Sequence, residues 1–176
     1  MIVPIPNRNY WSALGRLVRD QESWHALSWA DNPRYLELVD FAAHTLGIDR
    51  PFYFQAEPNL RIQEPGETAV PWHTDADFGH QVAEMNVWVP LTWIIDDSQR
   101  VWLDRGGSPF APKVQLGEAL IFPGAAVRHG NHVNTTTRTR RSMDFRLVLA
   151  EEFTETDNRT VVYDVPMTVG GYWRGR

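Results

Sequence analysis

The chain has 176 residues, of which 43% are hydrophobic and 22% charged, a composition typical of a folded domain and unlike that of a disordered chain. Its net charge of −5 argues against a nucleic-acid-binding surface, and its lack of cysteine excludes disulfides, thiolate metal sites and cysteine nucleophiles. Its apolar runs are far shorter than the roughly 20 residues of a membrane span. With no secretory signal in the first residues, we expect a cytoplasmic protein.

The first 50 residues are predicted to form a helical front. Asn7 or Asn9 can cap a helix that runs to about Val18, because apolar residues recur there at helical spacing. A second helix is predicted after the cap residues Asp31-Asn32, with Pro33 in its first turn, and it ends near Gly47.

From residue 51 the hydrophobic period changes to two and turn residues become frequent. Short strands at close spacing predict a mainly β protein with N-terminal helices packed on one face of a sandwich or barrel. No linker divides the chain, so residues 1–176 are expected to form a single domain, with residues 51–176 as its β core. The predicted strands span residues 52–55, 60–63, 84–93, 101–103, 118–122, 125–129, 141–149 and 161–165.

Three residues have the chemistry of a metal site. His73 and Asp75 are two positions apart, so in an extended segment their side chains point to the same side. His129 follows a later predicted strand. Two imidazoles and one carboxylate can occupy one face of an octahedral ion and leave the other face open, as in non-haem Fe(II) oxygenases. A structural zinc site usually has four protein ligands, so this set favours Fe(II).

A basic segment after His129 adds a carboxylate-binding pair. Arg140 and Ser142 point the same way on the predicted strand and offer a guanidinium fork and a hydroxyl to one carboxylate. That pairing suits the distal carboxylate of 2-oxoglutarate. Asp144 and Arg146 continue the same face, so they form either an interior ion pair beneath the site or a surface pair.

Taken together, these motifs resemble the Fe(II)/2-oxoglutarate-dependent dioxygenases, nearest to the phytanoyl-CoA dioxygenase-like branch and to streptomycin-biosynthesis-type oxygenases. The resemblance covers roughly residues 52–150. It implies a double-stranded β-helix (jelly roll), iron held by His73, Asp75 and His129, and 2-oxoglutarate held by Arg140 with Ser142. The motifs that carry it are the segments 73–75, 79–81, 84–92, 117–122, 129–131, 139–142 and 144–146.

Four further residues are candidates for the pocket. Asn86 can hydrogen-bond 2-oxoglutarate near the iron, and its neighbour Trp88 either lines the pocket or packs in the core. Arg61 can hold an anionic substrate group if its face of the strand is interior. Arg100 resembles a position at which relatives of this kind place substrate-facing groups. His132 offers a different ligand set, that of a zinc hydrolase using His73, His129 and His132.

The expected function is oxidation, by hydroxylation, of a small molecule in secondary metabolism, with Fe(II), 2-oxoglutarate and O2. Two alternatives stay open: a jelly-roll module that binds a small ligand without catalysis, and a cupin-type metal enzyme that does not use 2-oxoglutarate. Neither alternative needs Arg140. The expected partner is a small-molecule substrate, with no nucleic acid and no membrane. Because relatives of this branch are usually longer, the pocket could be open, completed in a homodimer, or built for a carrier-bound substrate.

Overall fold

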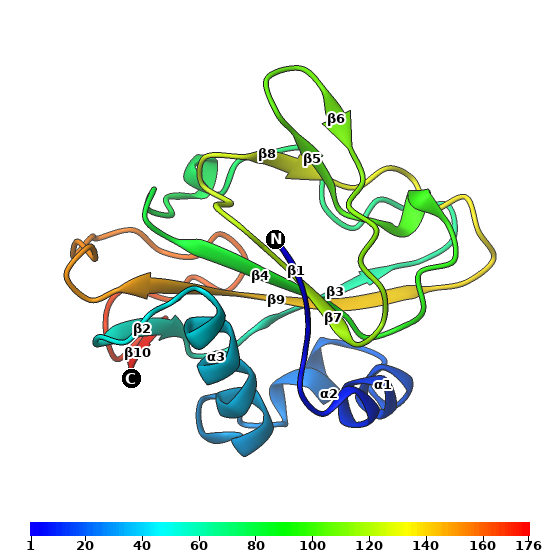
Figure 1. Ribbon diagram of the computed structural model, residues 1–176. Helices are drawn as coiled ribbons and strands as arrows, with labels where there is room; N and C mark the ends of the chain where they lie inside the picture. Colours follow the sequence, from blue (N-terminus) through cyan, green and yellow to red (C-terminus); the bar gives the residue numbers. More distant parts are fainter.

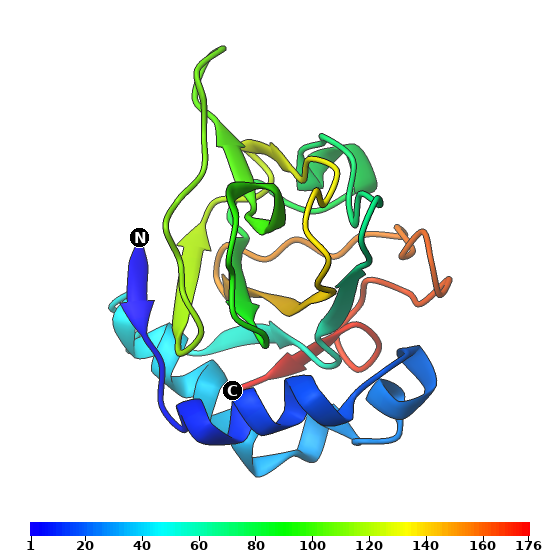
Figure 2. The same ribbon diagram turned by 90° about the vertical axis from the view of Figure 1, so that its right-hand side faces the viewer.

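The computed structural model describes residues 1–176, which form two antiparallel sheets facing each other (Figures 1 and 2). The larger sheet has seven strands in the order β1-β7-β4-β9-β2-β10, with β3 also paired to β9; the smaller has the order β6-β5-β8. The strands are β1 (Ile2–Pro4), β2 (Phe52–Gln55), β3 (Asn59–Gln63), β4 (Met85–Pro90), β5 (Trp102–Asp104), β6 (Pro109–Phe110), β7 (Glu118–Phe122), β8 (Arg128–Gly130), β9 (Arg140–Leu149) and β10 (Trp173–Gly175).

Three helices cover the outer face of the larger sheet: α1 (Arg8–Leu17), α2 (Gln21–His25) and α3 (Pro33–Thr45) (Figure 1). The predicted limits of α3 are confirmed, because the Asn32 side chain accepts hydrogen bonds from the first-turn amides and Gly47 takes a positive φ of 71° just beyond the helix. Short 3₁₀ turns are η1 (Trp29–Asp31), η2 (Asp75–Phe78) and η3 (Asp97–Gln99). None of the helices combines the length and apolar character needed to cross a bilayer. A mainly β fold with N-terminal helices is therefore confirmed.

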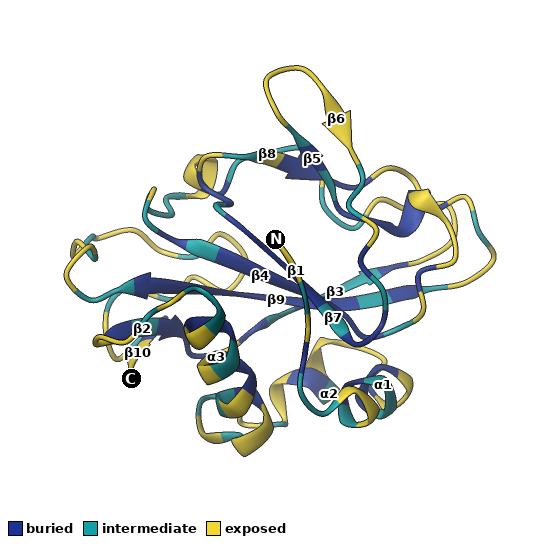
Figure 3. Cartoon of the chain, viewed as in Figure 1, coloured by how far each residue is buried: buried dark blue, intermediate teal, exposed yellow.

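The main hydrophobic core lies between these helices and the larger sheet. The helices contribute the fully buried rings of Trp11, Trp24 and Tyr35, and the sheet contributes alternate residues such as Val87 and Phe145. Aromatic side chains of this size bury about 150–250 Å² each, so they dominate the apolar burial. Figure 3 shows the central strands dark blue and the outer helix faces yellow.

Strand β9 is the centre of the larger sheet and separates the core from the site. One edge pairs with β4, and the other pairs with β3 and then β2. Its odd-numbered residues Met143, Phe145 and Leu147 join the helical core. Four of its even-numbered residues, Arg140, Ser142, Asp144 and Arg146, are polar and buried between the two sheets. The fifth, Val148, joins a small apolar cluster near the end of the strand. A buried polar face must find partners inside the protein, so this face predicts a binding site.

Two sequence expectations differ from the structure. Residues 2–4 do not belong to the helical front, because β1 pairs with β7 and extends the larger sheet. Residues 161–165 do not form a strand: they lie in a loop closed by an Arg159–Asp164 ion pair, and Asp164 has a positive φ of 52°. The chain re-enters the sheet only at β10. Val161 and Val162 give the β-like pattern, but they are more than 70% exposed.

Candidate active site

The structure brings His73, Asp75 and His129 together, with one ligand atom from each within 4.8 Å of the others. The backbones of His73 and His129 exchange two hydrogen bonds of 2.9 and 2.8 Å, so the two imidazoles are cross-strand neighbours. Asp75 Oδ1 lies 3.4 Å from His73 Nε2 and 3.6 Å from His129 Nε2. This cluster can hold a metal ion.

Hydrogen bonds to the backbone select the nitrogen that each imidazole presents. His73 Nδ1 lies 2.8 Å from the Pro71 carbonyl, and His129 Nδ1 lies 2.8 Å from the Val127 carbonyl. Carbonyls accept only, so each Nδ1 carries the proton and each Nε2 keeps its lone pair for a metal. Burial also lowers the pKa of His129, which favours the neutral form that can bind a metal.

Asp75 is positioned by the backbone on one side and by side chains on the other. Its amide donates to the Gly124 carbonyl at 2.9 Å, and a Cβ at Gly124 would lie only 2.3 Å from Asp75 Oδ2, so only glycine fits there. Arg146 contacts both carboxylate oxygens, and Asn86 donates to Oδ2 at 3.3 Å. Burial alone would raise the pKa of Asp75, but Arg146, with smaller contributions from His73 and His129, holds it far below its usual range.

A chain of alternating charges continues from Arg146. The guanidinium of Arg146 lies 3.6 Å from Asp144, and Arg61 Nε donates to the same carboxylate at 2.8 Å. Asp144 and Arg146 are both buried, so the interior ion pair expected from the sequence is the correct alternative. Since Arg61 already has Asp144 as its partner, it is not a free anion-binding group.

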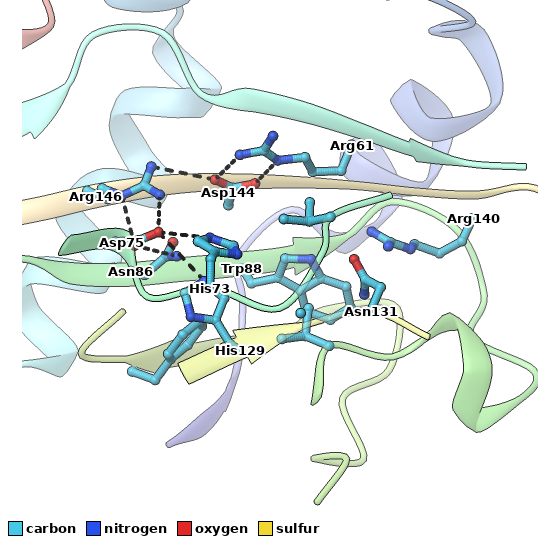
Figure 4. Close-up of a pocket in the computed structure, with 14 residues that line it drawn as sticks. Arg61, His73, Asp75, Asn86, Trp88, His129, Asn131, Arg140, Asp144 and Arg146 are labelled. Carbon is cyan, nitrogen blue, oxygen red and sulfur yellow. Dashed lines mark hydrogen bonds and ion pairs between the residues drawn. The ribbon is translucent and has the colours of Figure 1, made fainter. Parts of the chain in front are cut away.

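Arg140 lines the same small pocket as His73, Asp75 and His129, at its other end, and has no carboxylate partner. Its side chain is fully buried, Nε donates to Gln63 Oε1, Nη1 donates to Ser142 Oγ, and Nη2 has no hydrogen-bond partner. Burial, with repulsion from Arg61, lowers the pKa of Arg140 to about 9. Figure 4 shows Trp88 between Arg140 and the metal-ligand cluster. A buried cation without a counter-charge is costly, which indicates a site for an anion.

The small pocket opens into a larger groove with a cavity volume of about 1030 Å³. His73, Asp75, Arg61 and Arg146 line both spaces, so the metal-ligand cluster lies where they join. Residues 55–61, 69–71 and 160–163 form much of the groove wall. The loop 159–166 reaches the helical front, because Tyr163 Oη donates to Gln21 Oε1 at 3.2 Å and its ring contacts His25.

The other predicted site residues have mixed outcomes. Asn86, Trp88, Arg140 and Arg61 all line the small pocket. Trp88 Nε1 donates to Ser142 Oγ at 3.0 Å, so its ring is a wall of this pocket and does not line the groove.

Arg100 lines neither space. Its guanidinium contacts Asp97 and the carbonyls of Pro112 and Val114, so it holds loops together. A contact of Arg100 with substrate stays a prediction. His132 is exposed and packs on Trp72 and Trp102, outside the metal-ligand cluster. The contact of Arg146 with Asp75 was missed by the sequence reasoning; the only signal for it is the even-numbered polar face of β9.

Comparisons with known proteins identify the fold. No protein-family model matches the sequence. The chain is 38% identical over 122 residues to the streptomycin biosynthesis protein StrG of Streptomyces griseus, a match that covers 69% of this chain and 59% of StrG. Thus the match spans less than two thirds of that relative.

Solved structures of non-haem enzymes superpose on most of the chain. The non-haem monooxygenase ThoJ, in a nickel complex, has a TM-score of 0.64 at 17% identity and covers 98% of this chain and 81% of its own. The α-ketoglutarate-dependent epimerase SnoN of nogalamycin biosynthesis has a TM-score of 0.60 at 15% identity, and the match covers 96% of this chain and 90% of SnoN. Iron-bound HygX of Streptomyces hygroscopicus has a TM-score of 0.61 at 11% identity, and the match covers 92% of this chain and 87% of HygX. The chain has the fold of the non-haem iron, 2-oxoglutarate-dependent enzymes. The resemblance predicted from the sequence is confirmed at this level.

Proposed function

We propose that this chain is a non-haem Fe(II)/2-oxoglutarate-dependent oxygenase that hydroxylates a small molecule in secondary metabolism. Its two facing sheets would be the double-stranded β-helix of that family. The observation that carries the proposal is Arg140, a buried guanidinium without a counter-charge in the same pocket as the His73, Asp75 and His129 cluster. The streptomycin and nogalamycin proteins among its relatives support a role in secondary metabolism.

The donor set fits iron. Two neutral imidazole nitrogens and one carboxylate oxygen come from one side, and none of the ligands is a thiolate. His73, Asp75 and His129 would hold the ion, and the remaining positions would face the pocket and the groove.

The pocket also fits 2-oxoglutarate. Arg140 Nη2 is a buried donor without a partner, and the Ser142 hydroxyl lies next to Arg140. Arg140 and Ser142 would hold the distal carboxylate, which would supply the missing negative charge. The Arg140 guanidinium carbon lies 5.8 Å from the centroid of the Trp88 ring. The ring would limit access of water to the bound carboxylate.

When bound, iron and 2-oxoglutarate would supply the oxidising power to break an unactivated C–H bond, with O2 consumed and succinate and CO2 released. The chain itself would orient the reactants. The imidazoles present Nε2, Asp75 stays ionised, and Arg140 fixes one end of the cosubstrate. The groove would hold a small-molecule substrate beside the metal. A homodimer or a carrier-bound substrate remains a prediction.

The test of the metal site is its stoichiometry. His73→Ala and His129→Ala should each weaken Fe(II) binding more than about 100-fold, beyond the usual effect of an outer-shell change. Metal content is measured by mass spectrometry after anaerobic loading and desalting. His132→Ala is the matched control and should keep one equivalent, since His132 lies outside the cluster. Full metal content in both cluster variants would contradict the proposed site.

A further inference from the structure

The Asp75 carboxylate is held on both oxygens by groups that are not metal ligands. Arg146 Nη2 lies 2.8 Å from Oδ1 and Arg146 Nε lies 3.1 Å from Oδ2. Asn86 Nδ2 also donates to Oδ2, at 3.3 Å. Figure 4 shows Arg146 on the side of Asp75 away from the imidazoles. Oδ2 therefore has two donors, while Oδ1 remains the oxygen directed at His73 and His129.

Arg146 is itself fixed in place. Its Nη1 donates to Gln55 Oε1 at 3.3 Å and to Tyr172 Oη at 3.2 Å. Its carboxylate neighbours are Asp144 at 3.6 Å and Glu84 at 4.0 Å. With only 4% of its surface exposed, the guanidinium has no room for another rotamer and acts as a rigid support.

The charges around Arg146 explain why Asp75 depends on it. Three buried carboxylates, Asp75, Asp144 and Glu84, share this one guanidinium, and Arg61 adds a second cation beside Asp144. Without Arg146, Asp75 would be a buried charge with one neutral amide as its partner. A buried carboxylate that loses its two-point contact turns toward other donors, so Oδ1 would no longer be held toward the imidazoles.

We propose that Arg146 is a positioning residue for the metal site: its two-point contact holds the Asp75 carboxylate with Oδ1 aimed at the two imidazoles before a metal binds. The inference rests on the proposed metal site. A cation beside a metal would also repel it, so two effects compete. The five charged groups of this cluster carry a net charge of −1 when all are ionised, so the cluster as a whole still attracts a cation. The alignment of Asp75 therefore decides whether Arg146 strengthens or weakens metal binding.

The test is a titration of the full chain with Co(II) at neutral pH, in which binding is monitored by the visible absorption of the bound ion. Arg146→Met should weaken Co(II) binding about tenfold or more, the range found for outer-shell partners of metal ligands. Its Co(II) spectrum should change in intensity, because a displaced carboxylate alters the coordination. Arg146→Lys keeps the charge but not the two-point contact, so it should bind with intermediate affinity.

A matched control separates positioning from general loss of stability. Leu147→Ala lies next to Arg146 on β9 but faces the opposite side, in the helical core. It should lower the thermal midpoint, because it removes buried apolar volume, and leave the Co(II) affinity within about threefold of wild type, well below the roughly 10- to 100-fold effect of outer-shell changes.

The outcomes distinguish this inference from the proposed function. If the wild-type protein binds no Co(II), or if His73→Ala binds it as wild type does, the metal site fails and this inference fails with it. If the wild type binds one equivalent and the Arg146 variants bind it equally well or more tightly, Arg146 is a structural counter-ion and only this inference is overturned. Should Arg146→Met not fold, the comparison of Arg146→Lys with wild type decides.

Discussion

Arg140 is the residue at which binding and stability oppose each other. Its guanidinium is fully buried, contacts only neutral groups and lies near a second cation, Arg61. Burying a charge without a partner destabilises the fold, and replacing such a charge by an apolar side chain of similar size is often neutral or stabilising. The unpaired charge of Arg140 lies in the pocket that also contains the metal-ligand cluster. This location is expected if a bound anionic ligand offsets the cost of burying the charge.

Arg140→Met should therefore separate the two properties. We expect 2-oxoglutarate affinity to fall about 100-fold or more, because a charge-assisted hydrogen bond pair of roughly 3 kcal/mol is lost. The thermal midpoint of the ligand-free protein should stay equal or rise. Calorimetric titration of the Co(II)-loaded protein and a thermal scan measure the two effects, with the exposed Arg138→Met as control. Unchanged 2-oxoglutarate affinity would move the carboxylate site away from Arg140.

Single residues also show what the sequence could predict. His73, Asp75, His129 and Arg140 were predictable because extended backbone alternates its side chains, so spacing carries information about direction. The loop contacts of Arg100 were not predictable, because nothing local reveals that the carbonyls of a distant loop hold its guanidinium. Interactions between segments far apart in sequence are set by tertiary packing, which a spacing pattern does not contain.

Among the elements, β9 contains both the core and the site in one ten-residue strand. Met143, Phe145 and Leu147 face the helices, and the polar residues at positions 140, 142, 144 and 146 face the pocket. A shift of register by one residue would therefore exchange the two sets. The strands predicted at β2, β4, β7 and β9 agree with the structure because their alternation reflects these two faces. The strand predicted at residues 161–165 is absent because β propensity forms a strand only where a partner edge is available.

Helix α1 offers a test of how tightly the helical front is packed on the sheet. Gly15 faces the backbone of Leu91, and a Cβ there would lie 2.0 Å from the Leu91 carbonyl oxygen. Gly15→Ala should destabilise the fold by about 1–3 kcal/mol, the usual cost of overpacking, although alanine is the better helix former. Urea unfolding measures the change. Arg16→Ala, on the exposed face of the same helix, is the control and should change stability by less than about 0.5 kcal/mol. A Gly15→Ala protein as stable as wild type would contradict this packing.

At the scale of the whole molecule, one layer serves two purposes. The larger sheet packs its outer face on the helices, and its inner face meets the smaller sheet across the site (Figure 1). The 22-residue core includes residues of both the helical front and the sheet, so we expect residues 1–176 to unfold as one unit. The loop 159–166 contributes to the groove wall, so this chain supplies part of the wall that the sequence left to a partner or an open surface.

The most direct test of the central claim is the visible absorption of the Fe(II)-loaded protein when 2-oxoglutarate is added without oxygen. If His73, Asp75 and His129 hold the iron and Arg140 holds the cosubstrate, a weak visible charge-transfer band should appear and saturate at one equivalent of 2-oxoglutarate. The band should be lost in His129→Ala, and it should need a far higher 2-oxoglutarate concentration in Arg140→Met. Wild-type protein that binds one equivalent of Fe(II) but shows no band with 2-oxoglutarate would contradict the account.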